Sequence, residues 1–257
     1  MKRKPFCSLG ILLCIAVLAL AVANPAESRR AAPDLVGLAV VGDLVIVGKL
    51  LAAEGKVDPQ TRTMYTDVIV EVVKVIRNVT DQKVKVGSTI NFRQIGGEIG
   101  NRKTDLIGEA EFHKEEIGNL LLLSLKRPRP RATPWGRRGF DTIFDVFGGE
   151  HGKYTIKVKN KVPMVYLFWL ERPNEEIGLP LDLVLELMNM AITVASKNPV
   201  KNPKTPGEIP AEIRFKFRRL SSLEKSIRKL AMDRVPEAVI TAISREEIAR
   251  VKQELGL

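Results

Sequence analysis

Short runs of apolar and β-branched residues, separated by turn residues, fill most of the chain before residue 180 and constrain the fold more than any other feature. In the clearest run, residues 65–76, Val68, Val70 and Val72 lie on one face and Asp67 and Glu71 on the other, as on a strand with one buried face. The alternation slips by one residue at Val73, which is the pattern of a β-bulge. Further strands are predicted at 43–53, 89–95, 120–125, 142–147, 153–158 and 164–170, the last of the series.

Glycine-rich turns join several of these strands. Residues 148–152 predict a hairpin between the strands at 142–147 and 153–158. Residues 96–100 lack the lysine and the following helix of a phosphate-binding loop, so these glycines are predicted to serve a turn. Scarce helical patterns in this half argue against parallel winding. We therefore predict a mainly β fold, with an OB-like antiparallel β-barrel over residues 24–172.

The remaining residues, 173–257, are predicted to form a helical C-terminal extension, which makes the chain α+β overall. A proline-rich linker is expected at 197–210. Helices are predicted at 35–41 behind the cap Asp34, at 179–196, along an apolar stripe at 213–230, and from the capping box Ser244 and Glu247 to Leu255. The start of the stripe also fits a strand, and the pattern leaves both readings open.

The amino terminus predicts export. Lys2, Arg3 and Lys4 precede an uncharged run at 9–23, which ends in small residues before Asn24. The run is shorter than the roughly 20 residues of a membrane-spanning helix. We therefore predict a signal peptide at 1–23, cleaved between Ala23 and Asn24, and a periplasmic or secreted protein.

Cleavage changes the composition of the chain. Both cysteines, Cys7 and Cys14, leave with the signal peptide, so the mature chain can form no disulfide and no thiolate site. The remaining 234 residues are enough for a sizeable core without disulfides. The formal charge falls from +11 to +8, which favours anionic partners. Nucleic acid is not expected outside the cytoplasm.

Five short motifs occur in a fairly specific order: DLVIVG at 43–48, YTDV at 65–68, GGEIG at 96–100, LLLL at 120–123 and GKY at 152–154. This order resembles a group of secreted bacterial proteins whose barrel-like domain is similar to the OB-type barrel of netrin-like modules and tissue inhibitors of metalloproteinases. The resemblance covers about residues 34–158 and implies a fold more than an activity. The animal inhibitors chelate a metal through an amino-terminal cysteine, which a chain cleaved at Ala23 lacks.

No catalytic motif supports an enzyme, and no cofactor is predicted. The chain has neither a Gly-x-Ser-x-Gly turn nor a His-Glu-x-x-His motif, and its two histidines are His113 and His151. An alternative reading is a metal-dependent enzyme or metal-binding protein, with His113 and the glutamates Glu109, Glu111, Glu115 and Glu116 as ligands. A solvated loop before the strand at 120–125 is the favoured reading.

A basic loop at 126–138 is the main candidate site. It carries Lys126, Arg127, Arg129, Arg131, Trp135, Arg137 and Arg138, stiffened by prolines. Arginine binds phosphate or carboxylate with two hydrogen bonds, and tryptophan offers a stacking face. A solvated connection with a charge run is the competing reading.

The helical tail is the second candidate surface. Basic residues flank the apolar stripe at 218–230, as in a helix that lies on a membrane, although such a stripe more often packs on its own domain. Together these features predict an exported, non-catalytic binding module for a protein or an anionic envelope component. A further alternative is an accessory subunit that docks through its tail.

Overall fold

The computed structural model describes residues 34–59, 62–100, 102–104, 110–127, 144–147, 152–167, 177–197 and 210–257. These residues belong to one compact unit, 33–257. The predicted signal peptide, its cleavage point at Ala23 and Asn24, and most of the predicted linker lie outside the described residues. In the described part, no helix combines the length and apolar character needed to cross a membrane.

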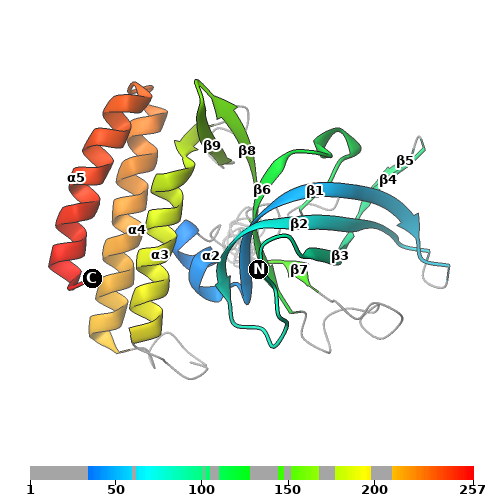
Figure 1. Ribbon diagram of the computed structural model, residues 1–257, viewed down its shortest axis with the longest axis horizontal. Coiled ribbons are helices and arrows are strands. Elements are labelled where there is room, and N and C mark those ends of the chain that lie inside the picture. Colours follow the sequence, from blue (N-terminus) through cyan, green and yellow to red (C-terminus); the bar gives the residue numbers. More distant parts are fainter. Residues whose placement is uncertain are drawn as a thin grey trace, which may run out of the picture. The chain divides into compact units, whose positions relative to one another are not determined.

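An antiparallel sheet is the main element of the fold (Figure 1). Its strands follow the order β10–β9–β8–β6–β1–β2–β3, and β7 also pairs with β6. The strands are β1 Leu44–Val57, β2 Met64–Asn78, β3 Thr89–Ile95, β6 Leu120–Lys126, β7 Asp145–Val146, β8 Lys153–Lys159, β9 Val162–Leu167 and β10 Ile177–Pro180. A two-stranded sheet consists of β4 Gly97–Ile99 and β5 Arg102–Thr104, and η1 Lys114–Glu116 is a 3-10 turn. The antiparallel sheet is therefore confirmed, and β10 is a strand beyond the one predicted to be last.

The sheet is not closed into a barrel, so the predicted OB-like antiparallel β-barrel is wrong, although the antiparallel sheet itself is present. Closure would require β3 at one edge to pair with β10 at the other, and in the described residues these two strands pair only with β2 and β9. The sheet stays open because α3 Leu181–Lys197 and α4 Ala211–Met232 pack against β10. Helices, rather than a closing strand, bury this end of the sheet.

The predicted β-bulge is confirmed. Val47 pairs with Lys74 and Gly48 pairs with Val72, which leaves Val73 as the extra residue of β2. Two more register shifts interrupt the same pair of strands. Bulges increase local twist, so the long β1–β2 hairpin can bend around a core.

The predicted hairpin around residues 148–152 is wrong. β7 pairs with Leu125 and Lys126 of β6, whereas β8 pairs with the stretch from Leu120 to Leu123. Both strands therefore lie along the same edge of β6. A Cβ on Gly152 would lie 2.0 Å from the carbonyl oxygen of Phe147, so these two residues lie close together beside β6.

The glycines at 96–100 serve a turn, as predicted. Gly96, Gly97 and Gly100 have φ angles of 91°, 136° and 58°, which favour glycine. At Gly97 a Cβ would also lie 2.2 Å from the Oγ1 of Thr66 in β2. The chain therefore turns here into β4 while it stays close to the main sheet.

The predicted C-terminal helices are present. Figure 1 shows α3, α4 and α5 Glu237–Leu255 side by side, with the short α2 Leu35–Val41 between them and the sheet. The stripe that begins at Ile213 is helical, which decides against a strand there. The predicted capping box is wrong, because α5 already begins after Pro236 and Ser244 is buried within it. Proline fits the start of a helix, since its fixed φ matches helical geometry.

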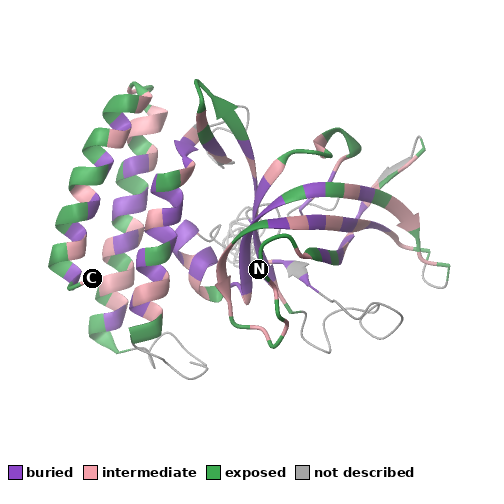
Figure 2. Ribbon diagram, viewed as in Figure 1, coloured by how far each residue is buried: buried purple, intermediate pink, exposed green. Residues whose placement is uncertain are grey.

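Two hydrophobic clusters lie on the two faces of the sheet. Val45 and Val47 of β1 face the cluster shared with α2, α3, α4 and α5. Leu44 and Ile46 face the second cluster, which is bounded by β2, β3 and Phe112. Figure 2 shows the resulting burial along β1, β2 and β6. Burial on both faces explains why these strands carry nearly continuous apolar runs.

Glu224 of α4 connects the N-terminus of α2 to the helical layer. Its side chain is 1% exposed and accepts hydrogen bonds from the backbone N–H groups of Leu35, at 3.0 Å, and Val36, at 3.2 Å. The same carboxylate forms an ion pair with Arg228. Asp34 completes the cap by accepting a bond from the Gly37 N–H at 2.7 Å, as predicted. The first turn of α2 thus depends on a residue of another helix.

This buried carboxylate should make stability depend on pH. Burial raises the pKa of Glu224 above its ordinary 4.5, although Arg228 opposes the shift. The contribution of a group with a raised folded-state pKa is fully present below its ordinary value and is lost as the pH rises through the folded-state value. We therefore expect the free energy of unfolding to decline from pH 4.5 upward, and Glu224→Gln to flatten that decline. Urea unfolding of both proteins across this range checks it, and parallel profiles would contradict it.

Candidate functional site

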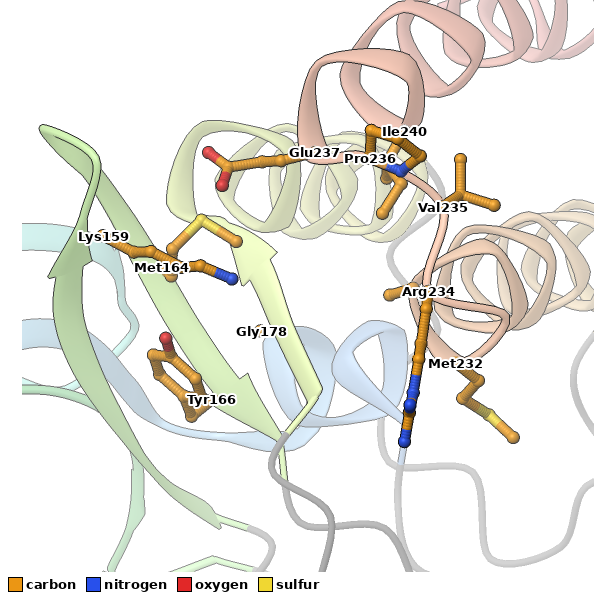
Figure 3. Close-up of a pocket in the computed structure, with 11 residues that line it drawn as sticks. Lys159, Met164, Tyr166, Gly178, Met232, Arg234, Val235, Pro236, Glu237 and Ile240 are labelled. Carbon is orange, nitrogen blue, oxygen red and sulfur yellow. The ribbon is translucent and has the colours of Figure 1, made fainter.

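A cavity of about 430 Å³ lies between the β8–β10 end of the sheet and the turn that joins α4 to α5 (Figure 3). This volume is within the range of small-ligand pockets. Lys159 and Tyr166 lie on the strand side, and Arg234 lies across from them on the helical side. Glu237 contributes a carboxylate from the first turn of α5. The cavity thus collects charged groups from three parts of the fold.

Arg234 reaches the cavity through an unusual backbone conformation. Its φ angle of 57° is in the left-handed region, where a helix end usually has glycine. The Arg234 N–H bonds the Ala231 carbonyl, and the Val235 N–H bonds the Leu230 carbonyl, each at 3.2 Å. This pair of bonds is the Schellman motif that ends α4. A strained non-glycine residue at a cavity suggests that its side chain has a function.

Lys159 and Tyr166 are positioned by the β8–β9 hairpin. Its two turn residues, Asn160 and Lys161, have φ angles of 52° and 67°, as in the type I′ turn that suits antiparallel strands. Tyr166 pairs with Gly178 of β10, where an added Cβ would lie 3.3 Å from the tyrosine ring. Glycine at 178 therefore leaves room for the ring against the strand.

The rest of the cavity is largely apolar. Met164 contributes a thioether side chain from the strand side and Ile240 adds a branched one, and Met232 and Val235 also line the cavity. Methionine adapts to irregular shapes because it is unbranched and polarizable. The cavity therefore offers an adaptable apolar surface next to charged groups.

The two cations of the cavity have no acidic partner among the residues that the structure describes. In the described part of the chain, neither Lys159 nor Arg234 forms an ion pair or a side-chain hydrogen bond. An anion that enters would gain charge-assisted hydrogen bonds without breaking existing ones. The arrangement can therefore hold an anionic head group against a short apolar body, while Glu237 disfavours a second negative charge on that ligand.

A second cavity, also of about 430 Å³, lies beside α3 and the C-terminus, and its charges are mostly paired. Lys252 bonds Glu186 at 2.5 Å, and Asp182 pairs with Arg245 at 2.8 Å. An incoming ion would have to compete with these pairs. We therefore take the first cavity as the candidate site.

The structure describes only the beginning of the predicted basic loop. Lys126 lies 5.1 Å from the ring centre of Phe147, and Arg127 pairs with Asp81 while its N–H bonds Asp43. The other predicted site residues, Arg129, Arg131, Trp135, Arg137 and Arg138, lie outside the described residues. The role of the loop stays a prediction.

The segment around His113 packs against the rest of the protein rather than lying free in solvent. Ala110 and Phe112 are buried, so the prediction of a solvated loop is wrong for them. His113 Nε2 lies 3.2 Å from Glu111, and Glu116 accepts bonds from the His113 N–H and from Lys153. No described group of three or more histidine, cysteine or acidic side chains is placed to hold a metal ion. Glu109 and His151 lie outside the described residues.

Lys153 is the centre of these contacts. Its ammonium group lies 2.8 Å from one oxygen of Glu116 and 4.6 Å from the ring centre of Phe112. Burial lowers the pKa of Lys153, and the carboxylates of Glu116 and Glu111 oppose that shift. These contacts attach the segment at 110–116 to β8, which is a structural role.

The apolar stripe of the predicted basic helix at 218–230 packs inside the protein. Leu220, Leu223 and Ile227 are each at most 1% exposed. They belong to the cluster between the helices and the sheet, so this side of α4 faces its own domain. The basic residues of the helix are therefore separated from its apolar side.

An open antiparallel sheet with a helical layer, and a charged cavity where the two meet, define the protein as an α+β chain with a candidate ligand site. Comparison with protein-family models, with curated proteins and with solved structures finds no match. The resemblance to netrin-like modules therefore stays a prediction.

Proposed function

We propose that this protein is an exported, non-catalytic binding module that holds an amphipathic anion in the cavity between β8–β10 and the α4–α5 turn. One observation carries the proposal: Arg234 adopts a left-handed backbone conformation at the wall of the cavity, opposite Lys159, and neither has an ion-pair partner among the described residues. Glycine would fit that backbone better, and arginine at this position places a guanidinium group at the wall of the cavity. A negatively charged envelope component with an acyl or similar apolar part fits this chemistry.

The test uses 1-anilinonaphthalene-8-sulfonate as a fluorescent amphipathic anion and decyl phosphate as its competitor. The protein should bind the dye, and decyl phosphate should displace it. Arg234→Gly should weaken decyl phosphate binding about 10- to 100-fold, because a hydrogen bond to a charged group contributes about 1.5–3 kcal/mol. The variant should fold at least as stably as the wild type, because glycine relieves the left-handed conformation.

Arg62→Gly is the matched control. Arg62 is also an exposed arginine in the left-handed region, with a φ angle of 56°, and it does not line the cavity. Its replacement should leave binding unchanged. Equal affinities for the two glycine variants would exclude the cavity as the site. Equal displacement by decyltrimethylammonium would show that the cavity does not select anions.

A further inference from the structure

The exposed face of α4 carries a line of cations opposite its buried face. Arg214, Arg218, Lys225 and Lys229 are separated by four, seven and four residues. At 100° per residue they fall within about 60° of arc, and at 1.5 Å per residue they extend over about 22 Å. We call these four residues the basic row. Three of them are exposed and Arg214 is half-buried.

The basic row has no acidic partners in the described part of the chain. The other cations of α4 are paired: Lys216 lies 2.8 Å from Glu212, and Arg219 lies 2.9 Å from Glu254. Arg228 pairs with the buried Glu224. Every acidic residue of α4 is thus engaged with a cation outside the row. Among the described residues, the row therefore presents four charges without an ion-pair partner on one side of α4.

An aromatic residue accompanies these charges. Phe215 is 56% exposed and lies next to the row, about 60° of arc from Arg218. Ser222 and Ser226, also exposed, are the neighbouring residues on this face. A cluster of cations is attracted to anionic head groups, and an exposed phenylalanine beside it offers an apolar contact at the same surface.

We propose that the basic row and Phe215 form a docking surface for a bilayer rich in anionic phospholipid. Charge complementarity favours it, since cations near such a surface are attracted to its head groups. The row follows one straight helix, which suits a flat surface. The contact uses the side of α4 that packing leaves free, whereas its leucine stripe stays buried. The proposal is independent of the cavity.

Vesicle co-sedimentation tests this surface. The protein should bind vesicles of phosphatidylcholine with 30% phosphatidylglycerol, and 0.5 M salt should abolish binding because it screens exposed charges. The variant with Arg214, Arg218, Lys225 and Lys229 all replaced by glutamine should bind about 100-fold more weakly or worse, since each cation near the surface contributes about a fivefold effect. Glutamine preserves the helix because its helix propensity is high.

The control removes the same charge elsewhere. Lys49, Lys74, Lys83 and Lys85, all exposed and outside α4, are replaced together by glutamine. This variant should bind within about fivefold of the wild type, because charges far from the surface are screened. Equal weakening of both variants would show that binding depends on net charge alone, and it would overturn the proposal.

Two more results separate the bilayer from other anionic partners. Phe215→Ala should weaken binding to vesicles and leave retention on immobilised polyglutamate unchanged. Retention on polyglutamate without vesicle binding would overturn the proposal in favour of an acidic polymer. Loss of vesicle binding on replacing Arg129, Arg131, Arg137 and Arg138 by alanine, with the basic row intact, would assign the contact to the loop instead. Arg234→Gly should bind vesicles normally, so the cavity and the row are tested separately.

Discussion

Replacing Glu224 by alanine should lower the free energy of unfolding by about 3–5 kcal/mol, which is the usual effect of removing one partner of a buried ion pair. The substitution leaves Arg228 without its carboxylate inside the helical layer. It also deprives the N–H groups of Leu35 and Val36 of their acceptor, and a buried donor without a partner is itself unfavourable. Both effects act where α2 joins the helices.

Urea unfolding followed by far-ultraviolet circular dichroism measures this loss. Glu212→Ala is the matched control, because Glu212 forms an i,i+4 ion pair with Lys216 on the same helix but is 75% exposed. The control should leave the unfolding midpoint unchanged. A midpoint for Glu224→Ala that equals the control would show that the buried carboxylate contributes no net stability.

Replacing Phe92 by alanine should also lower the free energy of unfolding by about 3–5 kcal/mol. Phe92 is fully buried in the cluster of β1, β2, β3 and β6. Its ring meets that of Phe112 edge to face, with the ring centres 5.4 Å apart. Truncation removes this contact and leaves a cavity, and it loosens the 110–116 segment that Phe112 and Lys153 attach to the sheet.

Thermal and urea unfolding measure the loss, and amide hydrogen exchange locates it. We expect faster exchange at 110–118 in Phe92→Ala than in the wild type. Phe215→Ala removes the same atoms from an exposed position and should change stability by less than about 0.5 kcal/mol. Similar free energies of unfolding for the two variants would mean that the cluster around Phe92 repacks without loss of stability.

The strands could be predicted because burial repeats with a local period. Val68, Val70 and Val72 mark one face of β2, and the slip at Val73 marks its bulge. These signals depend on neighbouring residues alone. The helical character of α4 was harder to predict, because apolar and charged residues alternate in its first turns as they do in a strand. Packing against other helices decides between a helix and a strand there.

Strand pairing was not predictable, because the partner of a strand lies far away in the sequence. Glycines after β7 suggested a hairpin, yet β7 and β8 both pair with β6. The prediction of a β-barrel was wrong for a related reason. Each strand pattern reports that a face is buried, and it does not report whether another strand or a helix covers that face.

The candidate site escaped prediction for two physical reasons. Lys159 and Arg234 are about 75 residues apart and line one cavity only because the helices pack on the sheet. Arg234 also occupies a left-handed position without the glycine that usually marks one. The proline at 236, two residues further on, was the available signal for the end of α4 and the start of α5.

The capping of α2 sets an order on how the chain can fold during synthesis. The backbone N–H groups of Leu35 and Val36 bond to acceptor atoms that lie 189 and 188 residues later in the sequence. A helix of seven residues is too short to persist alone in water. The cap of α2, the first helix of the described chain, can therefore be completed only after α4 has been synthesised.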